Sequence, residues 1–107
     1  LNQIIVKEML GKIGLQPDLC WNGIEAVEAV NTSTYDLVFM DCRMPEMDGF
    51  EATETLRNQG HSLPIIALTA GTTLEEREHC IIAGMDDILV KPYTADEIKQ
   101  IVVEWVT

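Results

Sequence analysis

The chain has 107 residues, of which 18 are acidic and seven are lysine or arginine, giving a formal net charge of −11. This length suits one domain with a single hydrophobic core and excludes two. The acidic balance repels phosphate-rich partners, so we expect no direct binding to nucleic acid and no membrane contact by this domain.

The sequence carries no apolar stretch near the roughly 20 residues that a membrane-spanning helix needs. Its first 14 residues are amphipathic, with three charged side chains and no small-residue cleavage site, and are not typical of a secretory signal. We therefore expect a cytoplasmic protein. The cysteines are odd in number and lack the spacing of zinc ligands, so reduced, mostly buried thiols are expected. They are Cys20, Cys42 and Cys80.

The opening of the chain predicts a helix and then a weak strand. Residues 1–14 place apolar side chains at helical spacing, and Gly14 supplies a stop. Residues 16–21 are the weakest strand candidate, because Pro17 lacks the N–H that a ladder needs. This segment is therefore plausible only as an edge strand of the sheet, or as a strand whose N–H groups on the Pro17 side stay unpaired.

The middle of the chain predicts a helix, a strand and another helix. The turn at Asn22-Gly23 opens the first of these helices, and residues 35–41 form the first strong strand. Asp48-Gly49 then marks a turn and a helix start, to which we assign no chemical role. The side chains expected to face inward are Ile24, Val27 and Val30 in the first helix and Phe50, Thr53 and Leu56 in the second.

The last third of the chain contains two capping-box patterns. Thr73 with Glu76 predicts the start of a fourth helix, and Thr94 with Glu97 predicts the start of a final one. The strands before these helices are predicted over residues 64–69 and 87–90. One face of the final helix is expected to carry Ile98, Ile101, Val102 and Trp105.

Three of these apolar strands each end on a reactive polar residue, namely Asp41, Thr69 and Lys91. Short apolar strands that alternate with helices predict a parallel sheet buried on both faces, in an α/β fold. Ligands of such sheets bind beyond the carboxyl ends of the strands. A carboxylate, a hydroxyl and an amine are therefore expected to converge on one edge.

The residues around these positions resemble a known family. Four segments carry the resemblance: residues 41–53, Leu68-Thr69-Ala70, residues 83–87 and Val90-Lys91-Pro92. They are similar to the receiver domain of two-component response regulators, and most like receivers of hybrid sensor histidine kinases. The resemblance covers residues 1–107 as one receiver domain. It implies a flavodoxin-like doubly wound parallel sheet and a role in signal transduction by a phosphorelay.

The chemistry expected at this site follows from the residue types. Asp41 is a carboxylate nucleophile that can hold a phosphoryl group as an acyl phosphate. The resemblance to receiver domains implies that the domain catalyses this phosphorylation itself, with magnesium. Phosphoryl transfer needs positioning and charge neutralisation, and Mg²⁺ would suit, with Asp41 and the backbone carbonyl of Arg43 as oxygen ligands. Lys91 is expected to bind phosphoryl oxygens as a point charge, and Thr69 to donate a hydrogen bond to one of them.

The neighbours of these residues are predicted to form the switch and partner surface, together with Thr69 itself. The resemblance implies a cis peptide bond between Lys91 and Pro92, and the small side chain of Ala70 would leave the site open to the phosphodonor. Ile88 stands where many receivers have a tyrosine or phenylalanine ring, so an aromatic switch is not expected. Tyr93 is predicted to pack at a partner surface instead.

The resemblance also implies a leading strand with a pair of acidic metal ligands, which would precede Leu1. We therefore expect an N-terminally truncated receiver, with Mg²⁺ binding weak or absent in this fragment. Three explanations stay open. The sequence is trimmed, the expressed chain begins late, or a second copy fills the gap through strand exchange or a homodimer.

The best-supported function at this stage is a phosphoaccepting receiver whose partner is a histidine kinase or a histidine phosphotransfer domain. The resemblance places that partner on the first helix, near Ile4, and on the loop at residues 91–94. The alternative is a pseudo-receiver that binds proteins without phosphorylation. An aspartyl phosphatase is disfavoured, because those enzymes usually carry a second acid two residues on, where this chain has Arg43.

Overall fold

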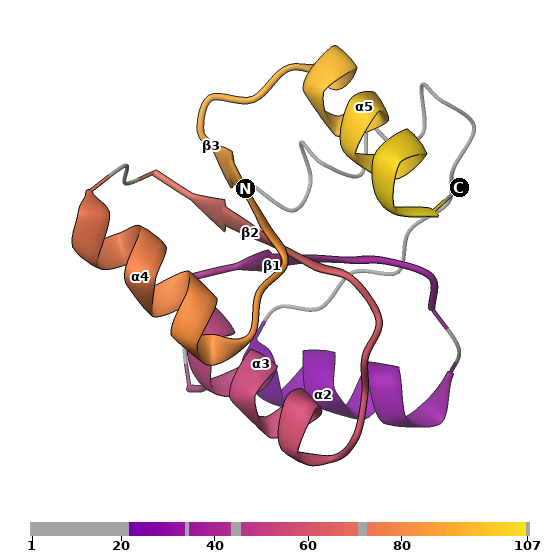
Figure 1. The fold of residues 1–107 in the computed structure, drawn as a ribbon. Coiled ribbons are helices and arrows are strands. Elements are labelled where there is room, and N and C mark those ends of the chain that lie inside the picture. Colours follow the sequence, from indigo (N-terminus) through magenta and orange to yellow (C-terminus); the bar gives the residue numbers. More distant parts are fainter. Residues whose placement is uncertain (1–21, 34, 44–45, 71–72, 107) are drawn as a thin grey trace.

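The computed structural model describes residues 22–33, 35–43, 46–70 and 73–106 (Figure 1). The predicted first helix and weak strand, over residues 1–21, lie outside this part of the chain. The described elements are α2 (Gly23–Thr32), β1 (Val38–Asp41), α3 (Gly49–Asn58), β2 (Ile65–Thr69), α4 (Leu74–Ala83), β3 (Asp87–Val90) and α5 (Ala95–Val106). Helices and strands alternate throughout, as an α/β fold requires.

The three described strands form a parallel sheet in the order β1-β2-β3, which confirms the predicted sheet type. All five residues of the central strand β2 are buried, since helices lie on both faces of the sheet. The strand predicted over residues 35–41 is shorter, because its ladder begins only where Val38 lies opposite Ile65. The predicted ends of β2 and β3, at Thr69 and Val90, are those that the structure has.

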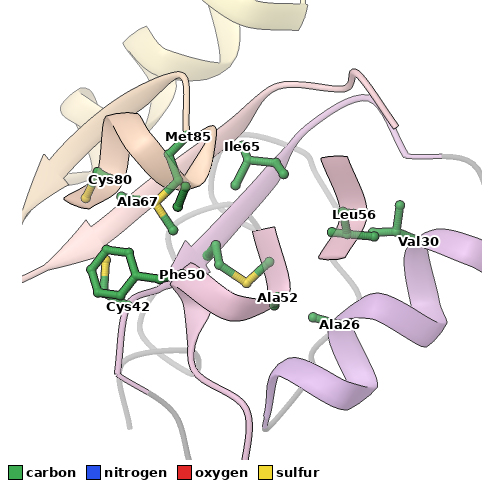
Figure 2. Close-up of a cluster of buried hydrophobic side chains, with 12 residues drawn as sticks. Ala26, Val30, Cys42, Phe50, Ala52, Leu56, Ile65, Ala67, Cys80 and Met85 are labelled. Atoms are coloured by element: carbon green, nitrogen blue, oxygen red, sulfur yellow. The ribbon is translucent and has the colours of Figure 1, made fainter. Parts of the chain in front are cut away.

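Two hydrophobic clusters lie on the opposite faces of this sheet. In Figure 1, α2, α3 and α4 lie on one face and α5 lies on the other. Alternate residues of β2 face the two sides, Ile65 and Ala67 toward the first cluster and Ile66 and Leu68 toward the second. Figure 2 shows the first cluster, with side chains of α2 and α3 pointing toward the sheet. The fold is therefore layered as predicted.

The predicted inward faces hold for two helices and fail at one residue of a third. Phe50, Thr53 and Leu56 of α3 are buried, and the apolar face of α5 packs on the sheet. In α2, Val30 is buried and Val27 partly buried, as predicted, but Ile24 is 42% exposed and Ala26 is buried in its place. The prediction for Ile24 was wrong, and the close contact described next explains why.

The start of α2 is fixed by Gly23, whose N–H donates to the carbonyl of Met47 at 2.8 Å. A Cβ on Gly23 would overlap that carbonyl, so the helix begins with this residue pressed against the loop before α3. Positions three and seven residues further along the helix, Ala26 and Val30, then share the buried face. Ile24 is consequently rotated out toward solvent.

Arg57 of α3 ties together the end of the sheet where β2 and β3 begin. Its guanidinium donates to the carbonyls of Gly84 at 2.9 Å and Leu63 at 2.8 Å. The same group pairs with the Asp86 carboxylate at 2.8 Å, which also accepts from the backbone N–H of Ile65 at 2.9 Å. Charge-assisted bonds of this kind are stronger than neutral ones, so this end of the sheet is firmly held.

The two predicted capping boxes both open helices. Thr73 and Thr94 each accept a hydrogen bond from the backbone N–H three residues on, at 3.2 Å. Gly84 ends α4 in the left-handed conformation, with φ of 104°. Among the described residues, no helix is both long enough and apolar enough to pass through a membrane.

Candidate functional site

The three polar residues predicted to converge lie at the carboxyl ends of neighbouring strands. Asp41 is the last residue of β1 and Thr69 the last of β2, while Lys91 directly follows β3. The backbone holds these ends in register, because the N–H of Lys91 donates to the carbonyl of Thr69 at 2.8 Å, and that of Cys42 to Leu68 at 3.1 Å. All three residues therefore occupy one edge of the sheet.

Asp41 and Lys91 form an ion pair across this edge. Lys91 Nζ lies 3.4 Å from Asp41 Oδ2, and the two side chains are 21% and 12% exposed. The other carboxylate oxygen, Oδ1, accepts from the backbone N–H of Arg43 at 3.0 Å. Because β2 lies between β1 and β3, the pair spans the end of the central strand. This partial shelter strengthens the attraction relative to a surface pair.

The Thr69 side chain contacts α4. Its side chain is buried, with the residue 4% exposed, and Oγ1 donates to Glu76 Oε1 at 3.1 Å. The second carboxylate oxygen of Glu76 pairs with the Arg43 guanidinium at 3.0 Å. Glu76 was predicted only as half of a helix cap. Because the capping-box pattern already accounted for a glutamate at this position, nothing in the sequence indicated its contacts with Thr69 and Arg43.

Arg43, in the loop after β1, places its guanidinium near the ring of Phe50 in α3. Its side chain is 72% exposed, and its guanidinium carbon lies 5.7 Å from the ring centroid of Phe50. The ring of His79 from α4 stacks on Phe50, with the ring centroids 3.7 Å apart and the ring planes 8° from parallel. Helix α4 therefore meets α3 through stacked rings, and the loop after β1 through the ion pair of Glu76 with Arg43.

Gly49 permits the closest approach of α3 to the site. A Cβ at this position would overlap the carbonyl oxygen of Asp41 and would lie 2.9 Å from its carbonyl carbon and 3.0 Å from Cys42 Cα. These are backbone atoms and cannot rotate away. Position 49 therefore has to be glycine, because the Asp41 backbone leaves no room for a Cβ there.

We predict that Gly49→Ala lowers the free energy of unfolding by about 3 kcal/mol, as overpacking against backbone does. Helix propensity alone would favour alanine by about 1 kcal/mol, so the steric term decides the sign. The measurement is the midpoint of urea unfolding. Gly60→Ala is the control: it has φ of 91° and nothing within 4 Å of the added carbon, and should cost about 1 kcal/mol. Equal losses in the two variants would contradict the steric argument.

The predicted switch residues differ in exposure. Ala70 and Pro92 are exposed, and the Lys91–Pro92 peptide bond is cis, as the resemblance implied. Ile88 is partly buried against the core cluster beneath α2, α3 and α4. Tyr93, predicted at a partner surface, is instead only 7% exposed and packs with residues of β2, β3 and α5. Its aromatic ring completes the cluster under α5, which the sequence pattern did not reveal.

Burial also governs the titration of groups near the site. Desolvation raises the pKa of the Tyr93 phenol, and the negative charge of Asp41 raises it further. Its hydroxyl has no hydrogen-bond partner within the described part of the chain. The pKa values of the Cys42 and Cys80 thiols are likewise raised by burial, so both stay protonated at neutral pH. Two of the three cysteines are thus buried and free, as predicted.

The donors available for a metal ion are few among the described residues, which contain no cluster of three or more His, Cys, Asp or Glu side chains that could hold one. The acidic pair Asp86-Asp87 lies at the opposite end of the sheet, where Asp86 is bound by Arg57. The Asp41 carboxylate and the Arg43 carbonyl are oxygen donors of the type that Mg²⁺ takes with water and phosphate oxygens. Their chemistry fits Mg²⁺.

Comparisons with known proteins agree on one family. The family model described as response regulator receiver domain matches residues 1–103. The sensor histidine kinase RcsC of Escherichia coli (strain K12) is 37% identical over 100 residues, which are 94% of this chain and 10% of RcsC. The chain therefore spans about a tenth of the length of this relative.

Solved structures of receivers have the same fold. The receiver domain of the sensor histidine kinase PA1611 from Pseudomonas aeruginosa, solved with magnesium in its active-site cleft, superposes with a TM-score of 0.91 at 40% identity, over 98% of this chain and 88% of that one. The Ssk1 receiver of Saccharomyces cerevisiae, solved in complex with the phosphotransfer protein Ypd1, gives 0.88 at 27% identity, over 98% and 81%. With Asp41, Thr69 and Lys91 gathered at one edge of a flavodoxin-like sheet, this chain belongs to the response regulator receiver domain family.

Proposed function

We propose that this receiver domain takes a phosphoryl group from a phosphohistidine onto Asp41 and passes on the change to a partner. The observation that carries the proposal is the Asp41–Lys91 pair, 3.4 Å apart at the carboxyl edge of the sheet. A carboxylate oxygen of Asp41 would attack phosphorus as the P–N bond breaks. The electron pair of that bond returns to the imidazole nitrogen, and an acyl phosphate remains on Asp41.

The residues around Asp41 would supply charge and orientation. Lys91 is already beside the carboxylate and would follow the negative charge onto the phosphoryl oxygens as a point charge. The backbone N–H of Arg43, bound to Asp41 Oδ1 at 3.0 Å, fixes the orientation of the nucleophile. A Mg²⁺ ion bound by Asp41 and the Arg43 carbonyl would neutralise charge on the transferred group.

The proposed readout is a change in the position of Thr69. The phosphoryl group adds about −1.5 to −2 charges and three strong acceptor oxygens beside this hydroxyl. Reorientation of Thr69 toward them would alter the start of the loop before α4. Ala70, exposed next to Thr69, leaves room for the phosphodonor to approach.

The proposed partner is a histidine phosphotransfer domain or the histidine-bearing core of a kinase. The structural likeness to the Ssk1 receiver, solved with Ypd1, supports the first, and the similarity to RcsC supports the second. The exposed Pro92, directly after Lys91, would belong to the contact surface. Tyr93 would support this loop from below, through its packing in the core.

The test is to incubate the natural full-length protein with Mg²⁺ and either acetyl phosphate or a phosphorylated phosphotransfer domain. We expect one phosphoryl adduct that hydroxylamine releases, as an acyl phosphate requires, and that mass spectrometry locates at Asp41. A folded protein that stays unlabelled, yet still binds the phosphotransfer domain, would overturn the proposal in favour of the pseudo-receiver.

A further inference from the structure

Glu76 connects α4 to two groups that flank the phosphoacceptor. Its Oε1 accepts from the Thr69 hydroxyl at 3.1 Å, and its Oε2 pairs with the Arg43 guanidinium at 3.0 Å. Thr69 ends β2, and Arg43 lies two residues beyond Asp41. The carboxylate is only 15% exposed, so both contacts are partly sheltered from water. One side chain of α4 thus accepts from the last residue of β2 and from the loop after β1.

The capping boxes of α4 and α5 show that Glu76 is placed by the site. In α5, Glu97 Oε1 folds back onto its own N-cap and accepts from the Thr94 N–H at 3.1 Å and hydroxyl at 3.2 Å. In α4, Thr73 still caps the helix, but the Glu76 carboxylate points to Thr69 and Arg43. The same sequence pattern therefore yields a purely local cap in one helix and a long-range contact in the other.

The contacts of Glu76 compete with those of a phosphoryl group on Asp41. The Thr69 hydroxyl has one proton, so it donates to Glu76 or to a phosphoryl oxygen but not fully to both. The Arg43 guanidinium has five N–H donors and is not limited in this way, so the competition concerns the single proton of Thr69. In addition, the Glu76 carboxylate would lie near the new negative charge, and like charges in a partly sheltered site repel. The two arrangements of the Thr69 hydroxyl therefore exclude each other.

The contacts of Glu76 also help to position the first two turns of α4. Glu76 and His79 lie three residues apart and are neighbours on the surface of that helix. Glu76 contacts the loop after β1 through Arg43, and His79 contacts α3 through the stacked ring of Phe50. If Glu76 lost Thr69 and Arg43, only the aromatic contact would remain of these two. Release of Glu76 would thus loosen the start of α4 from the reactive loop.

We propose that Glu76 is a positioning residue that holds the Thr69 hydroxyl, with Arg43 beside it, in the unphosphorylated state and gives up Thr69 when Asp41 is phosphorylated. The proposal rests on the proposed function and adds a component to it. The carboxylate of Glu76 raises the free energy of the phosphorylated arrangement relative to the unphosphorylated one, because its hydrogen bond with Thr69 must break before that arrangement forms. Removing it should favour the phosphorylated arrangement without touching the reacting atoms.

The test compares beryllofluoride binding to variants of the natural full-length protein in the presence of Mg²⁺, measured by calorimetry. Beryllofluoride occupies the place of a phosphoryl group on a carboxylate. Glu76→Ala should lower the concentration for half-saturation about tenfold, the scale of one competing hydrogen bond to a charged group. Glu76→Gln keeps an acceptor for Thr69 but lacks the charge, and should fall between the wild type and Glu76→Ala.

Two further comparisons separate positioning from a general effect. Glu75→Ala removes the same charge from the same turn of α4, at an exposed position, and should leave the affinity unchanged. In a Thr69→Val background, which lacks the hydroxyl, Glu76→Ala should lose most of its gain, as a double-mutant cycle requires of coupled residues. Circular dichroism would verify that each variant folds.

The outcomes distinguish the two proposals. If the wild type binds beryllofluoride at Asp41 but Glu76→Ala behaves as Glu75→Ala does, the role of Glu76 is refuted and the phosphoacceptor function stands. The same holds if the gain persists in the Thr69→Val background. If the wild type does not bind and also takes up no phosphoryl group, both proposals fail.

Discussion

The Asp41→Asn variant is expected to take up no measurable phosphoryl group from either phosphodonor, while folding as the unmodified chain does. The amide is not a nucleophile toward phosphorus and leaves Lys91 without its charged partner. Asparagine keeps an oxygen that can accept from the Arg43 N–H, so the loop geometry should persist. Incorporation of label and urea unfolding, measured on the same preparation, separate loss of chemistry from loss of fold.

The matched control for Asp41→Asn is Asp48→Asn. Asp48 lies in the same loop and accepts from the Glu51 N–H at 2.9 Å as the N-cap of α3. Asparagine is as good an N-cap as aspartate, so this variant removes one nearby negative charge and keeps the helix start. It should label at the wild-type level. Label that persists in Asp41→Asn would mean that another side chain is the acceptor.

The Lys91→Met variant is expected to be phosphorylated roughly 10²–10³ times more slowly, the effect of removing one group that stabilises charge in a transition state. Methionine retains much of the apolar stem, so the loss reports on the ammonium group. Lys91 is the only lysine or arginine side chain that, in the described part of the chain, is paired with Asp41. The initial rate of labelling at saturating phosphodonor measures the effect.

Lys99→Met provides the control for Lys91→Met. It removes the same charge from an exposed position on α5 and should leave the labelling rate unchanged. The stability of Lys91→Met should change by only about 1 kcal/mol, because a partly exposed ion pair contributes little. A rate equal to that of Lys99→Met would remove Lys91 from the mechanism.

Most of the fold could be predicted from the sequence because local and long-range signals agree. The strand ends at Asp41, Thr69 and Lys91 combine an apolar run with a polar stop, and parallel pairing then places them at one edge. The caps of α4 and α5 depend only on residues within one turn, Thr73 and Thr94 among them. Such short-range patterns are readable without knowledge of tertiary contacts.

The errors arose where a contact distant in the sequence decides the outcome. Ile24 has the helical spacing of a core residue, but the approach of Gly23 to Met47 turns it outward. Tyr93 was assigned to the surface, whereas the space between β3 and α5 takes its ring. Glu76 satisfied a cap motif, so no signal in the sequence pointed to its bonds with the site. In each case the deciding neighbour lies far away in the sequence.

The Arg57 contacts have a mechanical consequence for the receiver. They fasten the beginnings of β2 and β3, while the reactive side chains occupy the finishes of the same strands. One end of the sheet is thus held rigidly, while the other end carries the residues that respond. A displacement around Thr69 can be absorbed by the helix beside it, with the far end of the sheet serving as a fixed base from which that displacement is transmitted.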